Sequence, residues 1–129
     1  MDLCNKEEFR QFVEGFPNLC ASGMVSSDYC RLFKVDFHTS RQQLIDSHQD
    51  FLLCCDWLAG CRFDDYATHY SPGTDRLLEK VCRRLGRSVS HGALVAAVLF
   101  LELPHVMPGN SPGLAVGISR FCPRLHAPA

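Results

Sequence analysis

The stretch from Thr74 to Pro104 constrains the fold most, because two different helix patterns follow one another there. Residues 74–85 place apolar side chains three and four positions apart among charged residues, which predicts an amphipathic helix with one buried face. Residues 93–101 are all apolar, and a helix that is apolar on every side is normally buried. Gly86 separates the two patterns, so the sequence predicts two core helices joined by a short turn.

Two further helices are predicted nearer the N-terminus. Asn5 and Glu8 form a capping-box pattern ahead of a stripe of aromatic residues at helical spacing. A longer helix is predicted over residues 41–59, where apolar residues recur at spacings of three and four and Gly60 can close the helix. The segment 28–37 between them fits either a short helix or a strand.

The residues after Pro104 carry two Pro-Gly pairs between short apolar runs, which predict a loop or hairpin with a strand over 114–121. The sequence therefore predicts a mainly α fold of four helices with a small C-terminal β element. A chain of 129 residues suits one domain spanning 1–129. Residues 123–129, which include two prolines, are expected to form a flexible tail.

Composition and charge point to an ordinary globular protein. Thirteen basic and 14 acidic residues give a formal net charge of -1, whereas a polyanion binder is usually basic overall. The N-terminal residues lack a signal-peptide pattern, so the eight cysteines are expected to be reduced, mostly buried thiols of a cytoplasmic protein. The longest apolar run is far shorter than the roughly 20 residues that cross a bilayer, so no membrane contact is expected.

The outer face of the predicted helix over 74–85 is the first candidate binding surface. Five basic residues gather on and just after it: Arg76, Lys80, Arg83, Arg84 and Arg87. Such a cluster can bind phosphates or an acidic protein surface. The alternative is a solvated face partly neutralised by neighbouring acids, in which Glu79 pairs with Arg83 one turn on.

A second candidate surface is the connection over 61–73, which is rich in polar and turn-forming residues. It carries two adjacent acids and two tyrosines: Asp64, Asp65, Tyr66 and Tyr70. Adjacent acids in a loop are usually solvated, so this surface ranks behind the basic one.

Three other functional hypotheses have less support in the sequence than the two candidate binding surfaces. A helix-turn-helix that reads DNA needs polar side chains on its second helix, whereas residues 93–101 are apolar. Structural zinc sites usually use a CxxC or CxxxC pair, which the candidate ligands do not supply: Cys54, Cys55, Cys61, His69 and Cys82. No catalytic or nucleotide-binding motif is present, so no metal and no cofactor are expected. An unrecognised Cys and His pair stays open as an enzymatic alternative.

Three segments together resemble a group of known sequences: His69-Tyr70-Ser71, VSHGALVAAVLF over 89–100 and NSPGLAVGIS over 110–119. They resemble the C-terminal half of small uncharacterised proteins carried by phages and plasmids. Those proteins share a His-Ser-Ser-Tyr start, an Ile-Ser-Asn-Gly-Ala-Phe-Ile-Ala-Ala helix and an Asn-Ser-Pro-Asn loop. This chain has His91 and Gly113 where that pattern has Asn. The resemblance implies an origin in a mobile genetic element.

The function expected from these observations is non-enzymatic binding of a host protein or protein complex. Small mobile-element proteins without catalytic motifs often inhibit a host defence system stoichiometrically, as an anti-CRISPR does, or act as maintenance factors, and this expectation is an analogy. The alternatives are an enzyme that uses a Cys and His pair and a nucleic-acid binder that uses the basic helix face.

Overall fold

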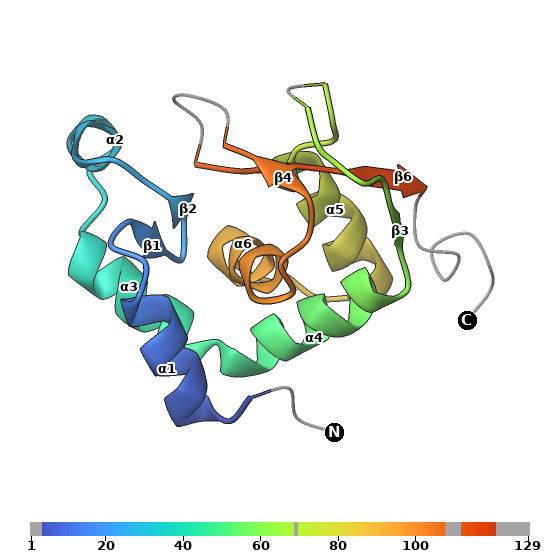
Figure 1. Cartoon of the computed structure of the whole chain (residues 1–129). Coiled ribbons are helices and arrows are strands. Elements are labelled where there is room, and N and C mark those ends of the chain that lie inside the picture. Colours follow the sequence, from blue (N-terminus) through green and yellow to red (C-terminus); the bar gives the residue numbers. More distant parts are fainter. Residues whose placement is uncertain (1–3, 69, 108–111, 121–129) are drawn as a thin grey trace.

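The apolar helix α6 (His91–Phe100) runs through the middle of the molecule in the computed structural model, which describes residues 4–68, 70–107 and 112–120 (Figure 1). The Ser90 hydroxyl caps this helix by accepting a hydrogen bond from the backbone N–H of Ala93 at 3.1 Å. Every residue from Gly92 to Val98 is buried. The predicted core helix is thereby confirmed, and its burial over 92–98 follows from its lack of a polar face. Leu99, Phe100 and Leu101, at the end of the predicted buried run, are half-buried.

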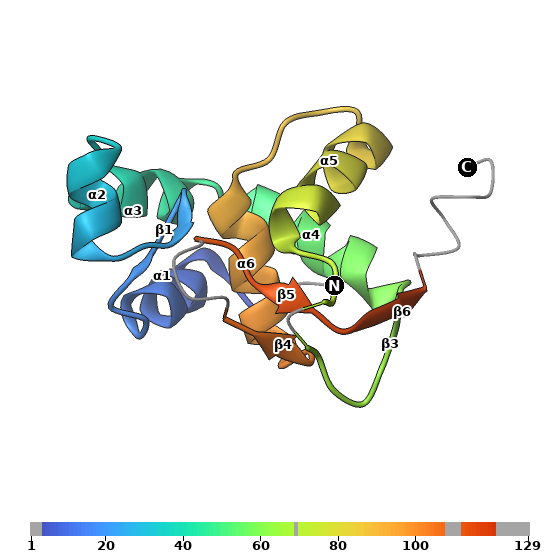
Figure 2. The same ribbon diagram turned by 90° about the horizontal axis from the view of Figure 1, so that it is seen from above.

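The other helices of the described ranges lie around α6. They are α1 (Lys6–Glu14), α2 (Ser27–Leu32), α3 (Phe37–Asp46), α4 (His48–Ala59) and α5 (Thr74–Leu85). Helices α4 and α5 pack directly against α6, while α1 packs against α3. Two views at right angles show α1, α2 and α3 on one side of α6 and α5 on the other (Figure 1, Figure 2).

The fold is mainly α, but the prediction of four helices is wrong, because the described ranges contain six. The predicted helix over 41–59 is two helices, α3 and α4, that meet at Ser47. The Ser47 hydroxyl donates hydrogen bonds back to the carbonyl oxygens of Gln43 and Leu44, both at 2.9 Å, and such bonds compete with continuation of a helix. The ambiguous segment near residue 28 forms the additional short helix α2.

Helix α1 begins as its capping pattern predicts. The Asn5 side chain accepts a hydrogen bond from the N–H of Glu8 at 2.8 Å, and the Glu8 carboxylate accepts one from the N–H of Asn5 at 2.9 Å. The aromatic stripe then packs into the core, where the Phe9 ring stacks on Phe51 of α4 with centroids 4.4 Å apart. Phe9 is completely buried, so this stripe anchors α1 to the rest of the fold.

The β structure is more dispersed than a single C-terminal element, which corrects that part of the prediction as well. Three two-stranded antiparallel sheets are present in the described residues. They pair β1 (Leu19–Cys20) with β2 (Gly23–Met24), β3 (Arg62–Phe63) with β6 (Ile118–Arg120), and β4 (His105–Val106) with β5 (Ala115–Val116). Strands of two or three residues are too short to show alternating polarity, so the sequence could not reveal most of them.

The segment around Leu114 ties distant parts of the chain together. Its N–H donates to the Thr74 hydroxyl at 2.9 Å, and its carbonyl oxygen accepts from the Thr74 N–H at 2.8 Å. The Met24 N–H donates to the carbonyl oxygen of Pro112 at 2.8 Å, which joins the same segment to β2. Thr74 is the first helical residue of α5, with Gly73 in the cap position.

The seven cysteines of the described residues are free thiols. No helix in these ranges combines the length and the apolar composition needed to cross a membrane. The predicted tail over 123–129, residue 121 of the predicted strand and His69 lie outside the described residues.

Candidate binding surface

Helix α5 is held with its charged side outward by its own sequence pattern. Leu77 and Val81 are completely buried on its inner side. Gly86 ends the helix as predicted, and it does so in the left-handed conformation, with φ at 68°. Gly60, for which the left-handed conformation was considered, ends α4 in a right-handed one, with φ at -90°. With the apolar side fixed against the core, Arg76 and Arg83 are exposed and Lys80 is half-buried.

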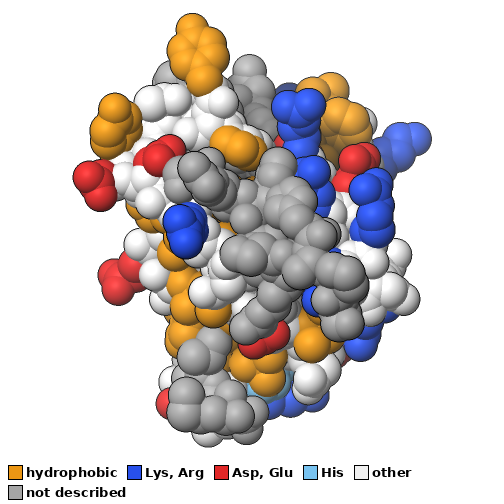
Figure 3. Space-filling view, turned by 90° about the vertical axis from the view of Figure 1, so that its right-hand side faces the viewer, with side chains coloured by type: hydrophobic (Ala, Val, Ile, Leu, Met, Phe, Trp, Pro, Cys, Tyr) orange, Lys and Arg blue, Asp and Glu red, His pale blue; other side chains and the backbone are white. Residues whose placement is uncertain are grey.

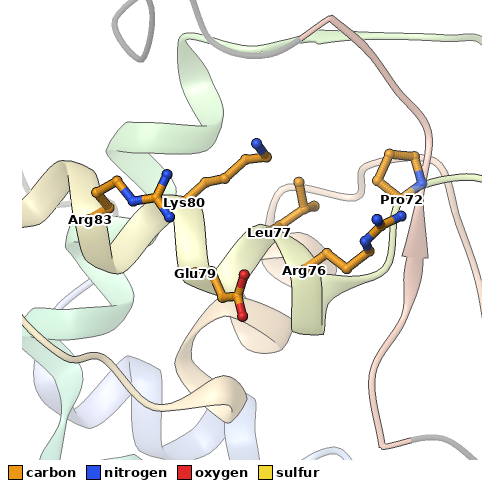
Figure 4. A pocket seen from close by; sticks show the side chains of 6 residues that line it. All are labelled: Pro72, Arg76, Leu77, Glu79, Lys80 and Arg83. Carbon is orange, nitrogen blue, oxygen red and sulfur yellow. The ribbon is translucent and has the colours of Figure 1, made fainter.

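A shallow groove of about 290 Å³ runs along the outer side of α5 (Figure 4). Its walls are formed by Pro72, Arg76, Leu77, Glu79, Lys80 and Arg83. Figure 4 shows the Arg76 side chain extending toward Pro72 and the Arg83 guanidinium turned toward Lys80, whereas the Glu79 carboxylate, which also lines the groove, points away from Lys80. The structure therefore brings together three of the five predicted basic residues, Arg76, Lys80 and Arg83, which we call the basic face.

The arginines of the basic face lack acidic partners in the described part of the chain. Neither Arg76 nor Arg83 forms an ion pair there, and the expected pair between Glu79 and Arg83 is not formed. Two other arginines do have local acidic partners, because Arg10 pairs with two glutamates on α1 and Arg31 pairs with an aspartate on α2. The exposed Arg62 of β3 has no ion pair in the described residues either. The basic face is thus an exposed positive surface with unneutralised guanidinium groups.

The two remaining predicted residues have different places. Arg84 is half-buried and does not line the groove. Arg87 forms an ion pair with Asp50 of α4, with Nη2 and Oδ1 2.6 Å apart. The Asp50 side chain is only 13% exposed. This ion pair links the residue that follows α5 to α4, and half of the Arg87 side chain remains exposed.

The second predicted surface is also exposed, and the connection that carries it reaches the groove at Pro72. Tyr66 is 73% exposed and Tyr70 98% exposed, and Asp64 and Asp65 are exposed as well. Pro72, two residues after Tyr70, lines the groove of the basic face. Figure 3 shows Lys and Arg side chains gathered along one edge of the visible face, with separate hydrophobic side chains protruding from its outline. Sequence reasoning treated the two surfaces separately and missed Pro72 as the link between them.

A buried polar cluster lies where the start of α5 meets the start of α6. The Thr74 hydroxyl oxygen and the His91 Nε2 are 2.8 Å apart, and Thr74 has no exposed surface. Burial lowers the pKa of His91, opposed by the negative charge of Asp75 and by a hydrogen bond to the Ser22 backbone, so the ring is neutral near pH 7. His91 therefore satisfies neighbouring groups of the fold.

Cys54 and Cys55 are not activated as nucleophiles. Cys54 and Cys55 are almost completely buried on α4. Burial raises the pKa of the Cys55 thiol to about 12 and that of Cys54 further, so both are protonated at neutral pH, and the thiolate is the reactive form. The described residues also contain no group of three or more His, Cys, Asp or Glu side chains placed to hold a metal ion.

Comparison of the chain with protein-family models, curated proteins and solved structures finds no match in any of them. Function is therefore inferred from the chemistry of the surface itself. The basic face is the surface feature that indicates one kind of partner, a molecule that carries negative charge.

Proposed function

We propose that this protein acts without catalysis, by binding another macromolecule through the basic face of α5. The observation that carries the proposal is the pair Arg76 and Arg83, exposed along one groove with no acidic partner in the described residues. An exposed guanidinium group without an acidic neighbour can bind a partner that supplies negative charge. Arginine also offers a planar set of donors that matches a carboxylate or a phosphate.

The biological setting that we propose is a mobile genetic element. In that setting the partner is a host protein or protein complex in the cytoplasm, and the protein is a stoichiometric inhibitor of a host defence system, such as an anti-CRISPR, or a maintenance factor. This part of the proposal is supported by the resemblance of 69–71, 89–100 and 110–119 to phage and plasmid proteins and by analogy with their usual roles.

Charge reversal on the basic face tests the proposal. The variant carries Arg76→Glu, Lys80→Glu and Arg83→Glu. Arg76 and Arg83 are exposed, so each of these two substitutions should change the free energy of unfolding by no more than about 0.5 kcal/mol. Because Lys80 is half-buried, the unfolding of the variant is measured as well. Tagged parent and variant are incubated with host lysate, and the captured proteins are identified by mass spectrometry. The proteins that the parent captures should be lost from the variant.

A matched control carries the same change of net charge on other elements: Lys6→Glu, Arg31→Glu and Arg62→Glu, all at exposed positions. This control should capture the same proteins as the parent. If the basic-face variant also captures them unchanged, the basic face is only a solvated surface and the proposal is wrong.

A further inference from the structure

The exposed Tyr70 near the basic face indicates which class of molecule binds there. Tyr70 is 98% exposed and therefore gains almost no packing energy from the described fold. It stands two residues from Pro72, which forms one wall of the groove together with Arg76. Tyrosine and arginine are the residue types, with tryptophan, that most often dominate binding energy at protein–protein interfaces. The groove and Tyr70 are thus joined through Pro72, and together they offer residue types that are common in protein-binding sites.

Acidic residues interrupt this surface. Glu79 lines the same groove as the basic face, and Asp75 is exposed one residue before Arg76. Asp64 and Asp65 lie on the connection over 61–73 that carries Tyr66 and Tyr70, which we call the tyrosine loop. A nucleic acid carries a regular row of phosphates, so laying it along the groove and the loop would bring phosphates against these carboxylates. A protein partner carries its charges at discrete positions and can place a carboxylate at each arginine while avoiding the acids.

We infer that the partner is a protein with an acidic contact surface, whose carboxylates bind Arg76 and Arg83 and whose neighbouring surface packs on Tyr70. The inference rests on the proposed function and specifies its partner class. Arginine and carboxylate form paired, parallel hydrogen bonds, which give this contact both strength and orientation. The tyrosine ring adds apolar contact area and a hydroxyl that can donate or accept a hydrogen bond.

Three labelled probes test the inference by fluorescence anisotropy at low ionic strength. The first is a peptide with glutamate at alternate positions and leucine and serine between them. The second is the same peptide with glutamine in place of glutamate, and the third is a thymidine oligonucleotide. The acidic peptide should bind at least about tenfold more tightly than either of the others, which corresponds to about 1.4 kcal/mol.

Variants then assign the contact to the surface. The double change Arg76→Ala and Arg83→Ala should weaken binding of the acidic peptide about tenfold or more and flatten its dependence on salt. Tyr70→Ser should weaken binding of the acidic peptide about threefold or more, because tyrosines are common among the residues whose truncation weakens protein–protein binding. A control with Lys6→Ala and Arg31→Ala, which lie on α1 and α2, should bind as the parent does.

The inference is overturned if the oligonucleotide binds as tightly as the acidic peptide, if the acidic peptide does not bind, or if Tyr70→Ser has no effect. These failures are distinct from failure of the proposed function. If the charge-reversed variant of α5 loses its captured proteins while the probes show no acidic preference, the proposed function stands and the partner chemistry is wrong. If that variant keeps its captured proteins, both are wrong.

Discussion

Gly92 lies where the backbone of α6 passes close to the backbone of the β1–β2 hairpin. Its replacement by alanine should destabilise the fold. The glycine lies at the start of α6 and donates its N–H to the carbonyl oxygen of Ala21 at 2.8 Å. A Cβ atom at this position would overlap the carbonyl oxygen of Cys20 and come within 2.8 Å of the Ala21 Cα. Both neighbours are backbone atoms of the β1–β2 hairpin, so they cannot rotate away as a side chain could.

The expected cost combines three effects. Overpacking a closely packed site costs about 1 to 3 kcal/mol. Separation of α6 from β1 weakens the Gly92 hydrogen bond to Ala21, whose net contribution is about 0.5 to 1.5 kcal/mol. Alanine offsets about 0.5 to 1 kcal/mol of this through its higher helix propensity. We therefore expect Gly92→Ala to lower the free energy of unfolding by about 2 kcal/mol, and Tm by about 8 °C for a chain of this length.

Urea unfolding followed by tryptophan fluorescence measures this change. Trp57 is the only tryptophan and is 3% exposed, so its emission reports on the core. The matched control is Gly15→Ala, because Gly15 has a right-handed conformation, with φ at -72°, and is exposed. This control should stay within about 0.5 kcal/mol of the parent. A Gly92→Ala protein with the parent's midpoint and m-value would refute the close approach of α6 to β1.

Two further predictions concern the buried polar cluster between α5 and α6. Thr74→Val should lower the free energy of unfolding by about 1 to 3 kcal/mol, because the N–H of Leu114 loses its buried acceptor, whereas Thr74→Ser keeps the hydroxyl and should cost less. The pKa of His91 is lower in the folded than in the unfolded chain, so the unfolded state binds more protons, and stability should fall as the pH drops below about 6.5. His91→Gln should make the free energy of unfolding less dependent on pH between about 7 and 5, and a variant with the parent's pH dependence would show that His91 is not the titrating group.

Local patterns in the sequence are sufficient for the elements whose formation depends on near neighbours. The caps at Asn5 and Ser90, the left-handed Gly86 and the burial of α6 all follow from residues within a few positions of one another. Capping, helix termination and amphipathic spacing act over one or two turns, so a single sequence reports them well. The basic residues of α5 were found for the same reason.

The tertiary structure decided what depends on residues far apart in the chain. Thr74 is bonded to Leu114, 40 positions away, and Gly92 is required by the backbone of β1, which no local pattern indicates. The ion pair between Asp50 of α4 and Arg87 likewise joins distant segments, and no local pattern indicates it. The sequence by itself determined which residues of α5 are basic and outward-facing. Only packing decided which of them share a groove and lie beside the tyrosine loop, because contacts between distant segments depend on how the whole chain closes around its core.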